Sequence, residues 1–266
     1  HHVYPGPDHY HPVASTYYRN NGDGTFSDES QSSGIGQSRG RGMGTVCADY
    51  DQDGDTDLFV ANDSAPNFLF QNDGRGRFTE TGLLAGVAYD EMGQRKGSMA
   101  AECADYDNDG LLDFYVTSCQ DQHATLYRNL GDGLFEDVTV LTGAAAGTFP
   151  HVTWGTGLMD FDNDGDRDLY IACGHLYDNV DLFSDAPAHK VANILLMNNG
   201  AGKFVDISRQ GGDGMQVVRS SRGAAFDDLD QDGDVDVVVL NSRDAPTILR
   251  NDSPRGDRHW LSVRLK

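Results

Sequence analysis

The sequence predicts an all-β fold of the β-propeller class, in which four-stranded sheets form the blades. Three observations predict it. A nine-residue acidic loop, D-x-D-x-D-G-x-x-D, occurs four times along the 266 residues. Each loop is followed by a short run rich in β-branched and aromatic residues, which favours a strand. A unit of four such strands recurs at about 55 residues, a spacing typical of propeller blades.

The order of parts along the chain predicts three regions. Residues 1 to 16 form an N-terminal extension, residues 17 to 256 form the blades, and residues 257 to 266 begin a C-terminal segment. At the front, YYRN and TFSDES supply only the second half of a blade. Four loop-bearing units follow, which is few for a closed ring. We therefore expect an arc or fragment of a larger propeller.

Within each repeat the strands follow a fixed order. A glycine-rich approach such as GIGQSRGRGMGTVCADY predicts an inner strand where backbones crowd together. The acidic loop, an apolar strand, a short turn and a third strand such as NFLFQN come next. A Gly-rich turn then precedes the outermost strand, as in NDGRGRFTE. The leading asparagine of this turn recurs in every repeat, as Asn20, Asn72, Asn129, Asn198 and Asn251.

The acidic loops have the ligand pattern of a calcium site. Side chains at positions 1, 3, 5 and 9 and a backbone carbonyl at position 7 supply hard oxygen ligands, and the glycine at position 6 permits the turn that gathers them. We expect about four structural Ca²⁺ ions, one in each loop. The predicted ligands are Asp49, Asp51, Asp53, Asp55 and Asp57; Asp105, Asp107, Asp109, Leu111 and Asp113; Asp160, Asp162, Asp164, Asp166 and Asp168; and Asp228, Asp230, Asp232, Asp234 and Asp236.

The EF-hand is the competing calcium motif, and the sequence excludes it. An EF-hand needs a bidentate glutamate at position 12 of its loop and a helix on each side. Position 12 is occupied here by Val60, Val116, Ile171 and Val239. Each of these residues lies in the run that predicts a strand.

The composition limits the classes of partner. The formal net charge is −22, and nearly half of the 42 acidic residues lie in the four loops. A surface this acidic argues against nucleic acid, whose binding depends on Lys and Arg neutralising phosphates. The longest apolar runs fall well short of the roughly 18 residues that a membrane helix needs. We therefore expect neither nucleic-acid binding nor membrane insertion.

Two further sets of residues recur in step with the loops. Cys47 and Cys103 each lie two residues before a loop, which predicts buried free thiols on neighbouring inner strands; one disulfide is the alternative. Tyr50, Tyr106 and Phe161 all occupy loop position 2. Their recurrence predicts that this aromatic side chain packs between blades.

The third repeat is longer than the others because GHLYDNVDLFSDAPAHKVAN, from Gly174 to Asn193, follows its acidic loop. Insertions in propellers map to loops on one face, which is often the binding face. Trp154, Tyr177 and Phe183 lie in or near this insertion. They either stack on a sugar or belong to the core.

The repeats resemble the FG-GAP/VCBS family, whose calcium loops also occur in the propellers of integrin α-subunits. The C-terminal half is more similar still to the bacterial ASPIC/UnbV proteins, which are related to cartilage acidic protein. The resemblance extends from Tyr17 onward and is carried by WGTGLMDFDNDGDRDLYIACGHLY, NILLMNNGAGKFVDIS, RGAAFDDLDQDGDVDVVVLNSRDAPTILRND and HWLSVRL. It implies a secreted, seven-bladed propeller with Ca²⁺ in its loops and a role in adhesion, matrix or carbohydrate recognition.

Our first functional hypothesis is a secreted or cell-surface, non-enzymatic module that binds a glycan or an extracellular protein. Extracellular calcium modules bind at about 10⁻⁴ to 10⁻³ M, so such loops fill outside the cell. No nucleophile elbow, HExxH motif or phosphate loop occurs in the sequence. Two alternatives stay open: a polysaccharide lyase-like propeller enzyme, and a structural subunit that self-assembles outside the cell.

Overall fold

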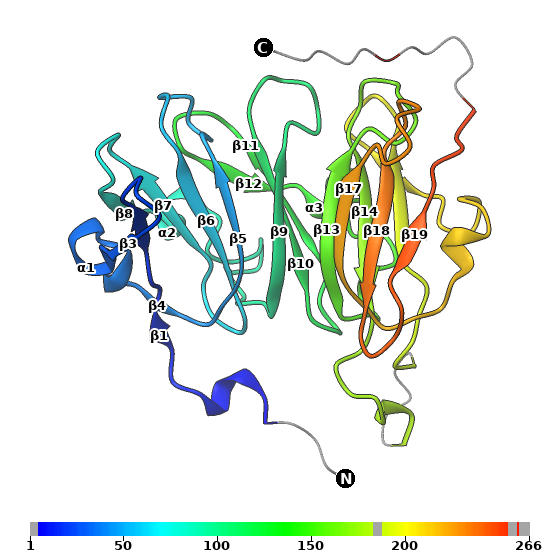
Figure 1. Cartoon of the computed structure of the whole chain (residues 1–266), viewed down its shortest axis with the longest axis horizontal. Helices are drawn as coiled ribbons and strands as arrows, with labels where there is room; N and C mark the ends of the chain where they lie inside the picture. The colour runs from blue at the N-terminus through cyan, green and yellow to red at the C-terminus, as the bar shows by residue number, and fades with distance from the viewer. Residues whose placement is uncertain (1–4, 183–187, 255–259, 261–266) are drawn as a thin grey trace. The chain divides into compact units, whose positions relative to one another are not determined.

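The computed structural model describes residues 5–182, 188–254 and 260 (Figure 1). In this part of the chain most regular structure is strand, and the helices are single short turns. The chain divides into two compact units. None of the described helices is long and apolar enough to cross a membrane.

Unit 1 comprises His1–Cys103, Leu111–Ser118 and Thr125–Val138. It holds two four-stranded sheets in the orders β5-β6-β7-β8 and β9-β10-β11-β12, preceded by the strand pairs β1-β4 and β2-β3. The strands are β1 (Val13–Ala14), β2 (Tyr18–Asn20), β3 (Phe26–Asp28), β4 (Arg39–Gly40), β5 (Gly42–Ala48), β6 (Asp57–Asn62), β7 (Phe68–Asn72), β8 (Phe78–Glu80), β9 (Ser98–Ala104), β10 (Asp113–Ser118), β11 (Thr125–Asn129) and β12 (Phe135–Asp137). The short helices are η1 (Pro7–His9), α1 (Ser30–Ser33), η2 (Ile35–Gln37) and α2 (Gly82–Ala85).

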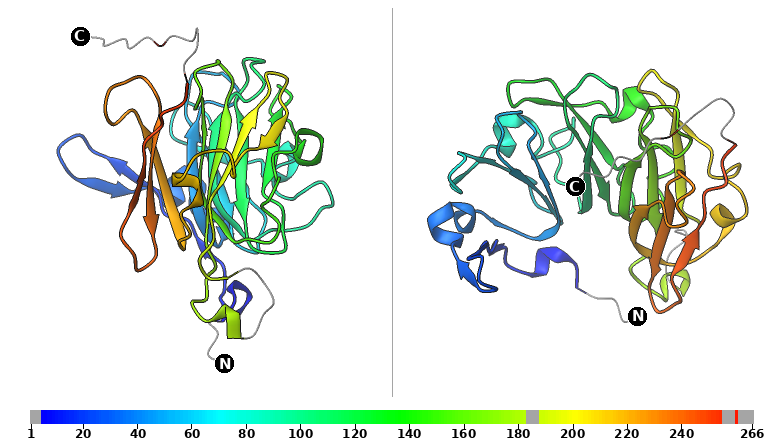
Figure 2. Two further views of the ribbon diagram at one scale, coloured as in Figure 1. Left: turned by 90° about the vertical axis from the view of Figure 1, so that its right-hand side faces the viewer. Right: turned by 45° about the horizontal axis from the view of Figure 1, so that its top comes forward.

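Unit 2 comprises Ala104–Gly110, Cys119–Ala124 and Thr139–Lys266. It holds a four-stranded sheet in the order β13-β14-β15-β16 and a three-stranded sheet in the order β17-β18-β19, whose strands lie side by side in orange in Figure 2. The strands are β13 (Thr153–Met159), β14 (Asp168–Cys173), β15 (Ile194–Asn198), β16 (Phe204–Asp206), β17 (Ser221–Asp227), β18 (Asp236–Asn241) and β19 (Thr247–Leu249). The short helices are α3 (Thr139–Thr142), η3 (Val180–Leu182) and η4 (Gly214–Gln216).

These sheets confirm the predicted all-β propeller class and the order of parts within a repeat. Each glycine-rich approach is the first strand of a sheet, and each acidic loop leads into the second. The front of the chain adds the pair β2-β3, the outer half of a blade, as the sequence predicts, and the pair β1-β4. The C-terminal segment predicted at residues 257 to 266 lies outside the described residues, apart from Trp260.

The first strands contain glycine because neighbouring backbones approach closely there. A Cβ atom on Gly44 of β5 would lie 2.9 Å from the Cα atom of Ala100 in β9. In unit 2, a Cβ atom on Gly155 of β13 would lie 2.5 Å from the backbone nitrogen of Ala224 in β17. Side chains larger than hydrogen do not fit at such separations.

The aromatic side chain at loop position 2 is buried and packs on the outermost strand of the next sheet. Tyr50 lies 5.6 Å, centroid to centroid, from Phe135 in β12. Tyr106 lies 6.0 Å from Phe204 in β16, with the two rings stacked. The predicted packing between blades is confirmed for these two loops.

The prediction for the cysteines is wrong at one position. All four side chains are free thiols, but Cys47 is exposed and Cys103 is only partly buried. Cys173, in β14, is the fully buried thiol. Position in the repeat therefore does not determine burial, because a first strand is covered only where another element packs against that face.

Candidate metal centres

The four acidic loops connect the first and second strands of their sheets. In the third loop, Met159 at the end of β13 pairs with Asp168 at the start of β14. In the first and fourth loops, Ala48 pairs with Asp57 and Asp227 pairs with Asp236. Position 9 of each motif is thus the first residue of the second strand, and the loop closes over its own strand ends.

The backbone of each loop takes the conformation that the motif demands. Position 6 is a glycine with φ between +90° and +95° in all four loops. Position 4 is also left-handed, with φ between 58° and 62°, at Gln52, Asn108, Asn163 and Gln231. The carboxylate at position 1 accepts a hydrogen bond from the N–H of the glycine at distances of 2.9 to 3.1 Å. These contacts curl the chain so that the odd-numbered side chains face one point.

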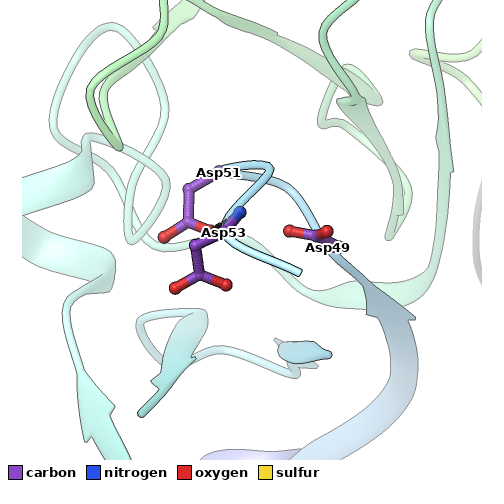
Figure 3. A group of neighbouring side chains, drawn as sticks. All are labelled: Asp49, Asp51 and Asp53. Atoms are coloured by element: carbon purple, nitrogen blue, oxygen red, sulfur yellow. Dashed lines mark hydrogen bonds between the residues drawn. The ribbon is translucent and has the colours of Figure 1, made fainter. Parts of the chain in front are cut away.

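Three of the four predicted side-chain ligands converge in each loop. In each loop, one oxygen from each of three aspartates lies within 4.8 Å of the others. Figure 3 shows the three from the first loop on their short turn. The groups are Asp49, Asp51 and Asp53; Asp105, Asp107 and Asp113; Asp160, Asp162 and Asp164; and Asp228, Asp230 and Asp236. Positions 1 and 3 belong to every group, whereas the third member is position 5 in two loops and position 9 in the other two.

The position-9 aspartates are buried, and the electrostatic consequence is large. Burial raises the pKa of Asp57 to about 6, and the backbone N–H groups of Asn72 and Tyr50 lower it by less. Burial likewise raises the pKa of Asp168 to about 7. Burial, together with the neighbouring carboxylates, also raises the pKa of Asp55. Among the described residues, Lys and Arg side chains do not offset the raised pKa values of Asp55, Asp57 and Asp168. The loops therefore concentrate negative charge.

A bound divalent cation fits this environment. The Oδ1 atom of Asp49, a predicted ligand at position 1, is buried and has no hydrogen-bond partner. A buried carboxylate oxygen without a partner carries a desolvation penalty that a cation removes. The donor set is all oxygen, which suits Ca²⁺ or Mg²⁺ and not the softer transition metals.

The asparagine that begins each outer turn holds its own loop and the preceding one. Its backbone N–H donates to the position-9 carboxylate of its own sheet at 2.8 Å in all four repeats. Its side-chain amide donates to the position-8 carbonyl of the same loop. In the last three repeats the amide also reaches the position-2 carbonyl of the preceding loop, with distances of 2.9 Å from Asn129 to Tyr50, 2.9 Å from Asn198 to Tyr106 and 2.7 Å from Asn251 to Phe161.

The sequence signals these asparagines only through their recurrence. Asn and Gly are ordinary turn residues, so pattern alone favours a turn and nothing more. The structure adds that Asn129 and Asn198 are buried, and that their amides connect successive sheets. Asn20, in the β2-β3 hairpin, is exposed, and its side chain accepts a hydrogen bond from Gly22 N–H.

The insertion from Gly174 to Asn193 begins at the opposite end of its sheet from the acidic loop. Thr153 pairs with Cys173 at this end of β13 and β14, whereas Met159 pairs with Asp168 at the loop end. The 3-10 turn η3 projects from this end of the sheet in Figures 1 and 2. The start of the insertion is therefore spatially separate from the third acidic loop.

Polar contacts hold the first residues of the insertion in place. The Nε2 atom of His175 lies 2.9 Å from Oε1 of Gln120, and its Nδ1 atom accepts a hydrogen bond from Tyr177 N–H. Arg222 donates to the carbonyl of His175 at 2.9 Å and places its guanidinium 4.5 Å from the ring centroid of Trp154. Trp154 thus stacks on an arginine of its own chain. Phe183 lies outside the described residues.

Comparison with known proteins supports the predicted family. Residues 10–60, 49–116, 105–171 and 160–239 each match the FG-GAP-like repeat. Cartilage acidic protein 1 of Mus musculus is 24% identical over 213 residues, and that of Homo sapiens is 28% identical over 213 residues; each alignment covers 78% of this chain. The chain spans 30% of the length of each of these relatives.

Among solved structures, a lectin of Agrocybe aegerita that recognises non-reducing terminal N-acetylglucosamine is similar with a TM-score of 0.40 and 19% identity. That alignment covers 90% of this chain and 75% of the lectin chain. The matches to the repeat and to cartilage acidic protein confirm the resemblance that the sequence motifs indicate.

Proposed function

The chain belongs to the FG-GAP-like repeat family, and from this premise we propose that it is a calcium-stabilised extracellular binding module without a catalytic role. Its partner is a glycan or an extracellular protein. Neither nucleic acid nor a membrane interior is part of the proposal. The metal organises the sheets, and the insertion in the third repeat meets the partner.

In this proposal each acidic loop holds one Ca²⁺, about four in all. The side chains at positions 1, 3, 5 and 9 and the carbonyl at position 7 would bind the ion. Ca²⁺ accepts six to eight oxygen ligands in flexible geometry, whereas Mg²⁺ demands a strict octahedron. The flexible, carboxylate-rich loop therefore favours Ca²⁺. The observation that carries this assignment is the buried Asp49 oxygen without a hydrogen-bond partner.

The metal stabilises the fold through mass action. A ligand that binds only the folded state at ten times its Kd contributes about 1.4 kcal/mol to the free energy of unfolding. Four such sites contribute an amount similar to the whole stability of a marginal domain. Sites of this class fill at the calcium concentrations outside cells and stay empty in cytosol, which supports secretion.

The partner-binding surface is assigned to the insertion. Gln120 and Arg222 hold His175 at the start of the insertion. Beyond His175 the insertion exposes apolar side chains: Leu182 is 71% exposed and Leu176 is 43% exposed. Exposed leucines at a loop built on a rigid sheet are typical of a contact surface.

A glycan array probed with the folded chain, in millimolar Ca²⁺ and in excess chelator, tests this function. We expect binding that is lost in chelator and in Leu182→Ser. Leu84→Ser is the matched control, because Leu84 is 81% exposed on α2 in the other unit. If the array is negative, an extracellular-protein array with the same two variants replaces it. Binding that is equal in both variants would contradict the assignment to the insertion, and large assemblies would favour self-association.

A further inference from the structure

The side chain at loop position 4 reaches across to the next acidic loop. In the second loop, Nδ2 of Asn108 donates to Oδ1 of Asp166 at 2.8 Å and to the carbonyl of Gly165 at 3.4 Å. In the third loop, Nδ2 of Asn163 makes the same two contacts one sheet further on, to Oδ1 of Asp234 at 2.7 Å and to the carbonyl of Gly233 at 3.3 Å. The acceptors are thus positions 6 and 7 of the following loop in both cases.

The left-handed backbone at position 4 directs this side chain outward from its own turn. Asn108 has φ of 59° and Asn163 has φ of 58°, a conformation that asparagine tolerates better than other non-glycine residues. The acceptor is a carboxylate, so the hydrogen bond is stronger than one between neutral groups. Asp234 is only 2% exposed, so this hydrogen bond is shielded from solvent.

The residue types at positions 4 and 7 match between successive loops. Asn108 and Asn163 each precede a loop with aspartate at position 7. Gln52, at position 4 of the first loop, precedes the loop that has Leu111 at position 7. Asparagine therefore occurs where the next loop offers a carboxylate, and the longer glutamine occurs where it does not.

Contacts also run in the opposite direction. The amide of Asn198 donates to the carbonyl of Tyr106, and that of Asn251 donates to the carbonyl of Phe161. These carbonyls belong to position 2 of the second and third loops. Each pair of successive loops in unit 2 is therefore connected twice, once forward through position 4 and once backward through the turn asparagine.

We propose that Asn108 and Asn163 are positioning residues that hold the calcium loop of the next sheet in the conformation that binds Ca²⁺. The inference rests on the proposed calcium sites. The amide fixes the segment at positions 6 and 7, and the position-7 carbonyl is a predicted ligand. A loop held in this way loses less conformational freedom when the ion binds.

Calorimetric Ca²⁺ titration of the full chain tests the proposal with Asn108→Asp. This variant keeps the shape of the side chain and its preference for a left-handed backbone, but replaces the donor with a carboxylate that faces Asp166. Gln231→Glu is the matched control: it adds the same charge at position 4 of the fourth loop, where no contact to a following loop is described. We expect one site in Asn108→Asp to bind about ten-fold more weakly, the effect of losing one charge-assisted hydrogen bond, and no such loss in Gln231→Glu.

A second variant separates pairing from charge. Asn108→Asp combined with Asp166→Asn exchanges the donor and the acceptor of the 2.8 Å hydrogen bond, but does not restore the 3.4 Å contact to Gly165. The double variant should recover most of the lost affinity. Melting curves of both variants are recorded in Ca²⁺ and in chelator. If Asn108→Asp does not fold, Asn163→Asp with Asp234→Asn repeats the test one loop further on.

The outcomes distinguish this inference from the calcium proposal on which it rests. If the unmodified chain binds no Ca²⁺, the calcium proposal fails. If it binds Ca²⁺ but Asn108→Asp behaves like Gln231→Glu, the positioning role is wrong. The positioning role is also wrong if the exchanged pair stays weak, or if melting falls equally in Ca²⁺ and in chelator.

Discussion

Replacing Asn129 with alanine should destabilise the fold more than any change in an ordinary turn. Asn129 is 1% exposed, and its Nδ2 atom donates to the carbonyl of Tyr50 at 2.9 Å and to that of Leu112 at 3.0 Å. Its Oδ1 atom accepts a hydrogen bond from Gly131 N–H at 2.9 Å. Alanine removes all three contacts. At about 1 kcal/mol each, the free energy of unfolding falls by roughly 3 kcal/mol.

Urea denaturation at equilibrium, in the presence of Ca²⁺, measures this loss. Asn20→Ala is the control, because Asn20 begins the corresponding turn of the β2-β3 hairpin but is exposed. Its side chain accepts from Gly22 N–H at 2.8 Å in a solvated setting, so we expect a loss below about 1 kcal/mol. Equal losses in the two variants would refute the reasoning, since they would show that the connection between sheets adds nothing to a local turn.

Three further predictions concern the loops and the inner strands. Asp53→Ala should lower the melting temperature in Ca²⁺ and leave it almost unchanged in chelator; equal drops would show that Asp53 is not a ligand. Burial raises the pKa values of Asp57 and Asp168 to about 6 and about 7. In chelator, the contribution of these two groups to stability should therefore be fully present below about pH 4 and lost as the pH rises through 6 to 7. Ca²⁺ should then raise the melting temperature more at about pH 8 than at about pH 5. An equal rise at both pH values would contradict this prediction. Gly155→Ala should lower the free energy of unfolding by about 1–3 kcal/mol, because its Cβ atom would lie 2.5 Å from a backbone nitrogen. Gly223→Ala is the control, because the nearest atom to its Cβ would lie 3.7 Å away, and it should unfold at nearly the original urea concentration.

The fold was predictable because its signals are local and repeated. A loop such as Asp160–Asp168 fixes its own turn through residues at set spacings, and the β-branched run after it specifies a strand. Four copies of the same order of parts then determine the propeller class, since a sheet of four short strands must bury its faces against similar sheets. The convergence of Asp49, Asp51 and Asp53 follows from the same local geometry.

Contacts between repeats were not predictable in the same way. The amide of Asn129 finds the carbonyl of Tyr50, 79 residues earlier, only after both sheets have formed. The contact from Asn108 to Asp166 likewise depends on how two loops lie beside each other. Burial of Cys47 failed as a prediction for the same reason, because a strand pattern does not say which face another element covers.

The most direct test of the central claim is the calcium content of the chain at equilibrium. The chain is stripped with chelator, dialysed against millimolar Ca²⁺ and analysed for bound metal by atomic emission, with a melting curve recorded on the same sample. We predict about four ions per chain and a melting temperature well above that of the stripped chain. Less than one ion per chain, or an unchanged melting temperature, would contradict the claim that the acidic loops bind the calcium that stabilises this fold.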